Sequence, residues 1–239
     1  MSITQNVKRA KADYDMVYKA AQDAFWDAAG ANKTEWVYRF SGACWNTYTF
    51  QPNFDLILSG NCTGTFYNTK INIDLVEYCE RKGIQFSTAN VTNPQNLFGY
   101  TDFTHLGVID LRNCAAMYNL FGSSRKLITI DKIIFKSDGS QVPDRIFTYC
   151  ESLENVTIEG VIGQNGLDVS HSKKLSKASI HSILGALAVH PTVANPTITL
   201  PKAAVDKAYE TSPGANDGST SLEWAVACEE RSAWTKALA

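Results

Sequence analysis

Apolar residues at helical spacing mark the first thirty positions of the chain. The segment from about residue 3 to residue 29 contains no Gly or Pro and is rich in Ala and Lys. Its apolar positions follow one another at alternating intervals of four and three residues: Ile3, Val7, Ala10, Tyr14, Val17, Ala21, Ala24 and Ala28. This heptad spacing predicts a helix about 40 Å long.

The apolar stripe of this helix has two interpretations. In the first it is the seam of a self-associating coiled coil, a homodimer or homotrimer whose oligomerisation residues are Ile3, Val7, Ala10, Tyr14, Val17 and Ala21. In the second, a single amphipathic helix packs on the following domain and covers its open end. The Ala-rich seam and the few flanking charges weaken the oligomer interpretation, and the pattern alone leaves both open.

After Gly30 the pattern changes to short apolar runs separated by polar turns. The runs are FDLIL (54–58), LGVIDL (106–111), LITIDKIIF (127–135) and LENVTIEGVI (153–162). Their β-branched content predicts strands. Because loops rather than full amphipathic helices separate them, the pattern argues against a doubly wound α/β sheet.

Five phenylalanines recur at intervals of 26, 32, 23 and 26 residues: Phe40, Phe66, Phe98, Phe121 and Phe147. Each is followed by a small or polar residue and then by apolar positions, most clearly in FGSSRKLITI and FTYCESLENV. The spacing predicts an α/β solenoid in which each coil is a short strand plus a turn, with the phenylalanines stacked in a continuous ladder. An ordinary α+β domain with scattered Phe residues is the alternative.

The C-terminal third returns to mixed helix and strand signals. Ser176 is a candidate N-cap for a helix over 177–190, TITL (197–200) predicts a strand, and Pro201 opens a helix over 202–210. A last helix is expected over 221–234, followed by a short apolar tail. The expected domains are therefore an N-terminal helix (1–30), the solenoid (31–170) and an α/β cap (171–239) that covers the edge of the solenoid.

The segments FTYCESLENVTIEGVIGQNG, LFGSSRKLITIDKIIF and TFYNTKI resemble BspA-like leucine-rich repeats. From about Asp13 onward the arrangement is similar to leucine-rich-repeat proteins of phages and prophages of gut Firmicutes. The resemblance implies a virion-associated or cell-surface binding role, such as a tail or fibre component. It carries over no catalytic or partner-contacting residues, because the family shares none.

Composition excludes several other classes of function. The chain has 239 residues and a net charge of −2, so it lacks the basic field that binds nucleic acid. No run approaches the roughly 20 apolar residues that span a bilayer, and the N-terminus has no signal-peptide core. We therefore expect no membrane insertion and synthesis in a cytosol. The resemblance implies that this is a bacterial host cytoplasm and that the chain has a place in the virion, with the bacterial cell surface as the alternative.

The chemistry-bearing residues form no known catalytic motif. The six cysteines include no CxxC pair, which predicts buried free thiols rather than a zinc site, and the four histidines lie far apart. HExxH, GxSxG and P-loop motifs are absent, so no cofactor or metal is expected. Two carboxylate pairs, Asp131 with Asp138 and Glu151 with Glu154, are conceivable as glycosidase residues, but their setting predicts solvated turn positions.

Aromatic residues with polar groups recur beside the phenylalanines: Trp36, Tyr38, Trp45, Tyr48, Tyr67, Tyr100, Tyr118 and Tyr149. Tyr and Trp are frequent binding anchors because they bury a large area with few rotatable bonds. The predicted partner-binding set is Trp45, Tyr48, Tyr67, Tyr100, Tyr118 and Tyr149. The expected function is non-enzymatic binding of virion proteins or of a host-surface protein or glycan. An adhesin of the same fold and, less favoured, a glycan-cleaving enzyme are the alternatives.

Overall fold

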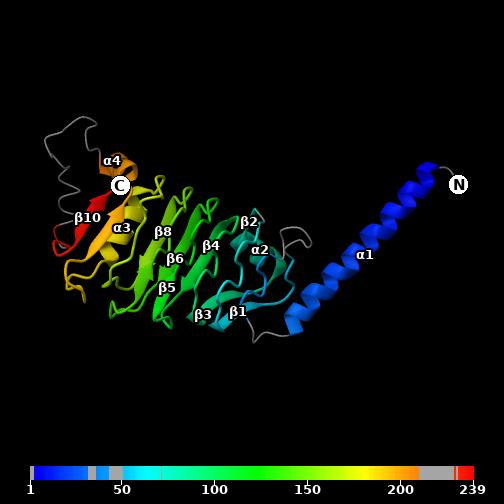
Figure 1. Cartoon of the computed structure of the whole chain (residues 1–239), viewed down its shortest axis with the longest axis horizontal. Coiled ribbons are helices and arrows are strands. Elements are labelled where there is room, and N and C mark those ends of the chain that lie inside the picture. Colours follow the sequence, from blue (N-terminus) through cyan, green and yellow to red (C-terminus); the bar gives the residue numbers. More distant parts are fainter. Residues whose placement is uncertain (1–2, 32–35, 43–50, 71, 210–228, 230) are drawn as a thin grey trace.

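The computed structural model describes the whole chain except residues 1–2, 32–35, 43–50, 71, 210–228 and 230. The long helix α1 (Ile3–Ala31) projects from one end of a body built of parallel strands, and the C-terminal elements lie at the other end (Figure 1). In chain order the body comprises β1 (Leu56–Asn61), β2 (Ile73–Asp74), α2 (Leu75–Lys82), β3 (Phe86–Asn93), β4 (Phe103–Asp110), β5 (Ala116–Tyr118), β6 (Thr129–Ile134), β7 (Val142–Asp144), β8 (Asn155–Glu159), α3 (Lys177–Ala186), β9 (Thr197–Leu200), α4 (Lys202–Tyr209) and β10 (Thr235–Leu238).

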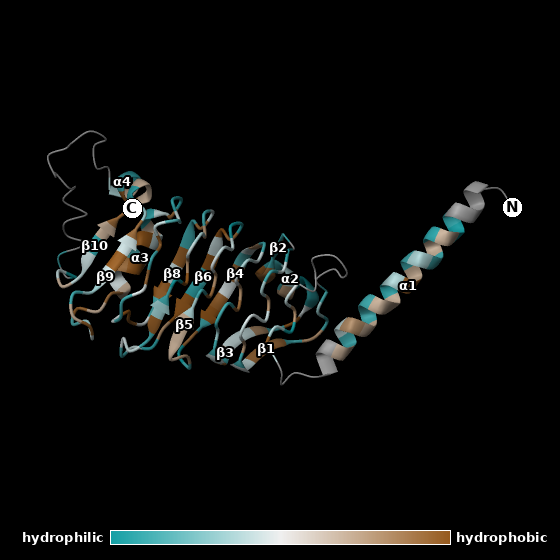
Figure 2. Ribbon diagram, viewed as in Figure 1, coloured by the Kyte–Doolittle hydropathy of each residue, from teal (hydrophilic) through white to brown (hydrophobic). Residues whose placement is uncertain are grey.

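All described strand pairs are parallel. The largest sheet has the order β2-β4-β6-β8, and two-stranded sheets are formed by β1-β3, β5-β7 and β9-β10. In the large sheet Leu106 faces Ile130 and Ile130 faces Val156, and all three side chains are buried. Figure 2 shows apolar residues along these strands and polar residues on the turns between them. The core is thus a stack of aliphatic side chains contributed by successive strands.

The five phenylalanines form a second line of core contacts, here named the Phe column: Phe40, Phe66, Phe98, Phe121 and Phe147. Successive ring centroids lie 5.4, 5.5, 5.7 and 5.5 Å apart, with stacked ring planes. All five rings are fully buried. The predicted ladder of phenylalanines is confirmed.

Hydrogen bonds join the turn around each phenylalanine to the next. The backbone N–H of Phe66 donates to Leu97 O at 3.0 Å, and the N–H of Phe98 donates to Leu120 O at 2.9 Å. The small polar residue three positions after a phenylalanine donates backward: Ser124 Oγ to Phe98 O at 2.6 Å, and Thr69 Oγ1 to Phe40 O at 3.2 Å. These bonds explain the polar residues, because they satisfy buried carbonyl groups.

The expected fold class, a BspA-like leucine-rich-repeat α/β solenoid, is wrong. The described residues form four separate parallel sheets of unequal size and four helices instead of uniform strand-and-turn coils. The longest phenylalanine interval, between Phe66 and Phe98, contains the helix α2, which the sequence did not predict. Asp74 caps α2 by accepting from Glu77 N, and Gly83 ends it in the left-handed region at φ 65°.

The C-terminal elements agree with the sequence in part. Ser176 caps α3 by accepting from Ser179 N, and the strand β9 spans the predicted residues 197–200. The expected last helix (221–234) lies mainly outside the described residues; of its described positions, Glu229 is helical and 231–234 form a turn and a bend. The short apolar tail that follows forms β10, which pairs with β9. Trp234 is buried there and donates from Nε1 to Ala188 O at 2.9 Å.

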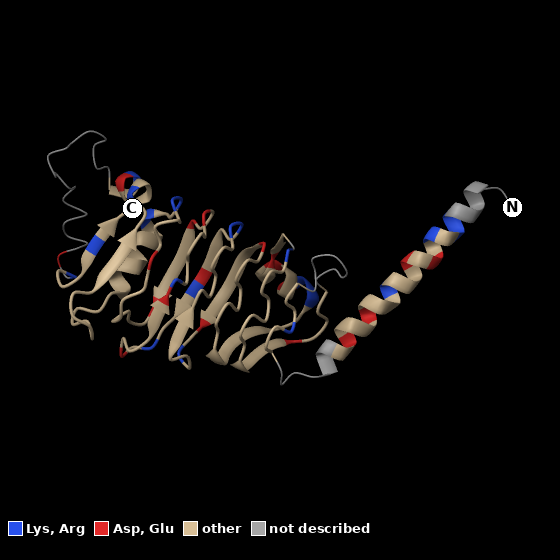
Figure 3. Cartoon of the chain, viewed as in Figure 1, with Lys and Arg blue, Asp and Glu red and all other residues tan. Residues whose placement is uncertain are grey.

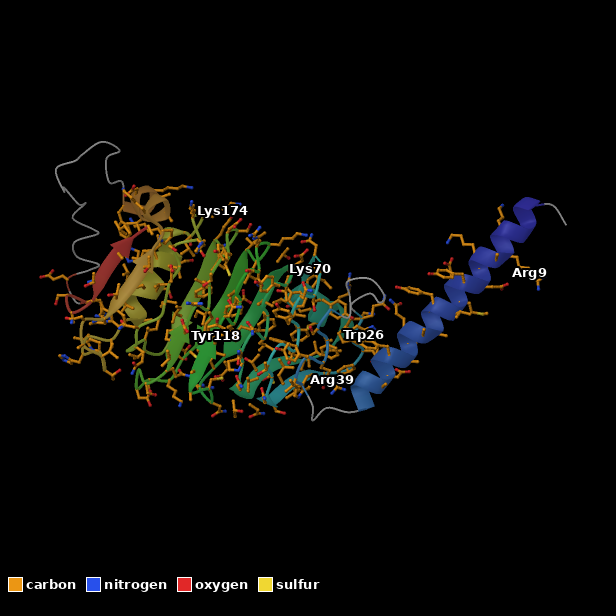
Figure 4. All side chains as sticks on the ribbon, in the orientation of Figure 1. Arg9, Trp26, Arg39, Lys70, Tyr118 and Lys174 are labelled. Atoms are coloured by element: carbon orange, nitrogen blue, oxygen red, sulfur yellow. The ribbon has the colours of Figure 1, made fainter. Side chains whose placement is uncertain are left out.

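Helix α1 contacts the body only near its C-terminal end. Trp26 is buried and packs on Phe40, the first ring of the Phe column, with the centroids 5.4 Å apart. Toward the N-terminus the helix leaves the body, and Tyr14 and Val17 are 68% and 65% exposed. In Figure 4, Trp26 is labelled near the body and Arg9 near the far end of the helix. The helix therefore packs on the body with its last turns while most of its length stands in solvent.

Candidate binding surface

Each turn around the Phe column contains two residues in the left-handed backbone region. The position two residues before each phenylalanine has φ between 50° and 60°: Tyr38, Gly64, Asn96, Asn119 and Arg145. The position two residues after has φ between 58° and 63°: Gly42, Asn68, Tyr100, Ser123 and Tyr149. Gly and Asn adopt this conformation readily, which explains their presence at such points.

Three of these positions carry tyrosine, which the left-handed conformation does not favour. Tyr38, Tyr100 and Tyr149 are 51%, 42% and 45% exposed. Gly42 and Asn68 make the same turn in other layers, so the fold does not require a bulky ring there. Strained positions with exposed side chains are characteristic of functional surfaces. The tyrosines thus point to a role outside folding.

The tyrosine rings lie close together along one edge of the body. Tyr38 and Tyr67 meet edge to face with centroids 6.3 Å apart, and Tyr67 and Tyr100 are 5.3 Å apart. Farther along, Tyr149 packs against His171 at 4.3 Å. We name these five residues the tyrosine edge. Burial raises the pKa of the Tyr67 hydroxyl, as do the neighbouring hydroxyls of Tyr100 and Tyr38.

The structure brings together only part of the predicted binding set. Tyr67 and Tyr100 are in contact, and Tyr149 occupies the turn position equivalent to that of Tyr100. Tyr118, 42% exposed, makes no ring contact with them, and Figure 4 labels it on the lower part of the body, away from Lys70, which donates from Nζ to Tyr100 O. The structure therefore does not join Tyr118 to this group of rings.

The predicted binding set and the tyrosine edge differ in four further residues. Trp45 and Tyr48, which belong to the predicted set, lie outside the described residues. Tyr38 and His171, which belong to the tyrosine edge, were missing from the predicted set. The signal for Tyr38 was its place two residues before Phe40. No local signal marks His171, because Val169 replaces the phenylalanine in its turn.

Charged residues beside the tyrosine edge balance one another. Asp102 accepts from Lys126 Nζ at 2.7 Å and lies 3.8 Å from Lys70 Nζ. Arg125 and Glu151 are 3.6 Å apart. Figure 3 shows both signs of charge along the ends of the strands. A mixed row of this kind produces no strong field, which suits an uncharged partner better than nucleic acid.

A second cluster, on the large sheet, joins three neighbouring strands through His105 of β4. Its Nδ1 lies 3.0 Å from Asp74 Oδ2 and its Nε2 lies 2.7 Å from Asp131 Oδ1. Partial burial of the imidazole lowers the pKa of His105, but the hydrogen bonds to Asp131 and Asp74 and their negative charges outweigh it and raise the pKa. Both ring nitrogens are occupied, so the arrangement serves as a cross-strand clamp rather than as a base.

A groove of about 440 Å³ lies between α2 and this cluster. Its lining is mainly apolar, including Val76, Phe86 and Val108, and Asp131 and Glu80 are its only carboxylates. Of the four carboxylates proposed as glycosidase residues, Asp131 contacts His105, Asp138 accepts from Ser140, and Glu151 faces Arg125. Each of these three is thus engaged by a neighbouring side chain.

The four described cysteines, Cys62, Cys79, Cys114 and Cys150, are buried free thiols, as predicted. Burial raises the pKa of Cys62 and Cys79 to about 11 and that of Cys114 and Cys150 to about 12. At neutral pH these thiols stay protonated, and a protonated thiol is a poor nucleophile. Within the described residues, no group of three or more His, Cys, Asp or Glu side chains is arranged to hold a metal ion.

Comparison with known proteins adds no relative. The chain matches no known protein family, no curated protein and no solved structure. In the described part of the chain, no helix is both long enough and apolar enough to cross a membrane.

Proposed function

We propose that this chain is a non-catalytic binding protein whose tyrosine edge contacts its partner. One observation carries the proposal: tyrosines occupy strained, half-exposed turn positions where most other layers have the smaller residues Gly, Asn or Ser. Because a bulky residue in the left-handed region costs about 1 kcal/mol or more of stability, its presence needs a benefit elsewhere. Partner binding through the exposed rings is such a benefit.

The rings are arranged to contact a partner together. The Tyr38, Tyr67 and Tyr100 rings form a continuous group, and the pair Tyr149–His171 extends the edge. Neighbouring strand layers are about 4.8 Å apart, so Tyr149, two turns after Tyr100, lies roughly 10 Å along the edge. Aromatic faces at this spacing suit the apolar faces of sugar rings or the exposed loops of another protein.

For the setting, we propose a virion-associated role as a phage tail or fibre component that contacts the host surface or a neighbouring virion subunit. The resemblance of FTYCESLENV and its neighbours to phage-encoded sequences supports this setting. A bacterial cell-surface adhesin is the second candidate, because the same surface would serve it. A glycan-cleaving enzyme is less favoured, because three of the four carboxylates considered for it are engaged by His105, Ser140 and Arg125.

The proposal is tested by measuring the binding of the purified chain to whole bacterial cells and to purified cell-wall polysaccharides. The double variant Tyr67→Ser, Tyr100→Asn removes two adjoining rings and leaves at position 100 a residue that the turn accepts. We expect it to bind at least about tenfold more weakly, because anchor residues contribute about 1–2 kcal/mol each. Tyr118→Ser, at the same 42% exposure as Tyr100, is the matched control and should bind as the wild type does.

The outcomes separate the candidates. Equal loss with the control variant, or no loss with the double variant, contradicts a role for the tyrosine edge. Binding to cells that is unaffected by the double variant places the contact elsewhere on the molecule. Release of sugars from the polysaccharides would contradict the non-catalytic role. Detection of the chain in purified phage particles distinguishes a virion protein from an adhesin.

A further inference from the structure

An apolar stripe runs along the part of α1 that leaves the body. Its described members are Ala10, Tyr14, Val17, Ala21, Ala24 and Ala28, and all are exposed. The side chains of Ile3 and Val7 lie outside the described residues. In the described part of the chain, no segment covers this stripe. A helix with its apolar stripe in water gains little from packing, which is the main source of helix stability in proteins.

The contact with the body uses the other side of the helix. Trp26, which packs on Phe40, follows Val17 by about two and a half helical turns and so points the opposite way. Gln22, one turn before Trp26, is also buried. Docking α1 on its own body thus leaves the stripe open to a second partner.

The two ends of α1 carry opposite charges. Lys8, Arg9 and Lys11 give its first third (3–11) a net charge of +3. Asp23 and Asp27 give its last third (22–31) a net charge of −2, and Asp13, Asp15 and Lys19 lie between. A helix lying antiparallel to an identical helix would place each basic end beside an acidic end. A parallel arrangement would place like charges together.

The helix dipole makes this distribution unfavourable for an isolated helix. The N-terminus of a helix carries a partial positive charge and attracts acidic residues, whereas the C-terminus attracts basic ones. Helix α1 has no acidic residue in its first turn and no basic residue in its last turn. Its basic residues lie mainly toward the N-terminus, which is the unfavourable end for them. An antiparallel neighbour compensates, because its acidic C-terminal third lies beside the basic N-terminal third.

We propose that α1 pairs antiparallel with α1 of a second copy of this chain through the apolar stripe. A register that sets stripe position against stripe position pairs Ala10 with Ala21 and Tyr14 with Val17. The two bodies then lie at opposite ends of a rod about 40 Å long. If the tyrosine edge binds as proposed above, the dimer carries two such edges facing separate sites; the pairing itself does not depend on that function.

The mass of the full chain in solution tests the pairing. Light scattering at about 0.1 mM chain should give twice the chain mass of 26.3 kDa, since even a Kd of about 10 µM populates the dimer at that concentration. Val17→Asp should return the chain to a monomer. Met16→Asp is the matched control, because Met16 is equally exposed at 66% but lies off the stripe. A monomeric wild type, or a dimer that survives Val17→Asp, overturns the proposal.

The orientation has two independent readouts. Added salt should weaken an antiparallel dimer, because it screens the attraction between oppositely charged ends, whereas it would strengthen a parallel one. In a background with Cys44 and Cys228 replaced by Ser, chains carrying Ala10→Cys should cross-link to chains carrying Ala21→Cys under mild oxidation. Neither variant alone should cross-link. Cross-linking of Ala10→Cys chains with one another, or strengthening by salt, overturns the antiparallel arrangement.

Discussion

Truncation of a central ring of the Phe column should destabilise the chain more than truncation of the last ring. Phe98 is fully buried and contacts four other rings, those of Phe66, Phe86, Phe103 and Phe121, with centroids 5.5 to 6.3 Å away. Phe147 is equally buried, but among the described residues its ring contacts only that of Phe121. The two residues therefore differ in ring contacts and not in burial.

The expected magnitudes follow from these contacts. Replacing a buried Phe by Ala costs about 3–5 kcal/mol through lost burial and the remaining cavity. Aromatic pairs contribute about 0.5–1.5 kcal/mol each beyond burial, so three additional contacts add roughly 2 kcal/mol or more. We expect Phe147→Ala to cost about 3 kcal/mol and Phe98→Ala about 5 kcal/mol. The second value is a large part of the roughly 5–15 kcal/mol that stabilises a typical domain.

Guanidinium unfolding followed by circular dichroism measures the difference. A lower midpoint with an unchanged slope reports a loss of stability rather than a change in the unfolded state. If Phe98→Ala does not fold, Phe98→Leu and Phe147→Leu keep the comparison measurable, because Leu fills much of the volume and costs less. Equal losses at positions 98 and 147, or a larger loss at 147, would refute the reasoning that ring contacts along the column stabilise the body.

Three further predictions concern single sites. The raised pKa of His105 favours its protonated form in the folded state. The cross-strand clamp at His105 should therefore contribute fully to stability below the ordinary pKa of 6.5, and this contribution should be lost as the pH rises through the folded-state pKa. Unfolding midpoints measured across pH should show the decline in the wild type and not in His105→Asn. Gly160→Ala should cost about 2–4 kcal/mol, because a Cβ there would clash with Phe135 O and the backbone has a φ of 91°, whereas Gly185→Ala in α3 should gain about 0.5–1 kcal/mol. Thermal unfolding of the two variants tests both signs. Cys114 and Cys150, with pKa values of about 12, should resist iodoacetamide at pH 8 until the chain is unfolded, and modification of the native protein, mapped by mass spectrometry, would contradict their burial.

The Phe column was predictable because it depends on intervals that can be read along the chain. Phe98 and Phe121 occupy the same place in successive turns, so their spacing alone brings them into contact. The start of α3 was also predictable, because the capping role of Ser176 is local. Signals of this kind act over a few residues or over one regular interval.

The fold class and α2 were not predictable on the same basis. The segment LVEYCERK is only eight residues long, too short for helical periodicity to stand out, although Asp74 and Gly83 are recognisable cap residues. Which strands share a sheet depends on long-range pairing, and the intervals do not encode it. The contacts of His105 with Asp74 and Asp131, 31 and 26 residues away, depend on that pairing in the same manner.

The candidate surface was half predicted for the same reason. Proximity to a phenylalanine identified Tyr67, Tyr100 and Tyr149. It also selected Tyr118, three residues before Phe121, because closeness along the chain does not say on which side of the turn a ring projects. The backbone conformation at the turn positions distinguishes the tyrosines of the edge from Tyr118, and only the structure shows that conformation.

Hydroxyl-radical footprinting tests the central claim, binding through the tyrosine edge, most directly. The radical modifies exposed aromatic rings, and mass spectrometry reports the extent at each tyrosine. When the chain is bound to bacterial cells or to the cell-wall polysaccharide it recognises, we expect protection of Tyr38, Tyr67, Tyr100 and Tyr149 and unchanged modification of Tyr118. Protection of Tyr118, or of Val76 and Phe86 in the groove at α2, with the edge left reactive, would contradict the account.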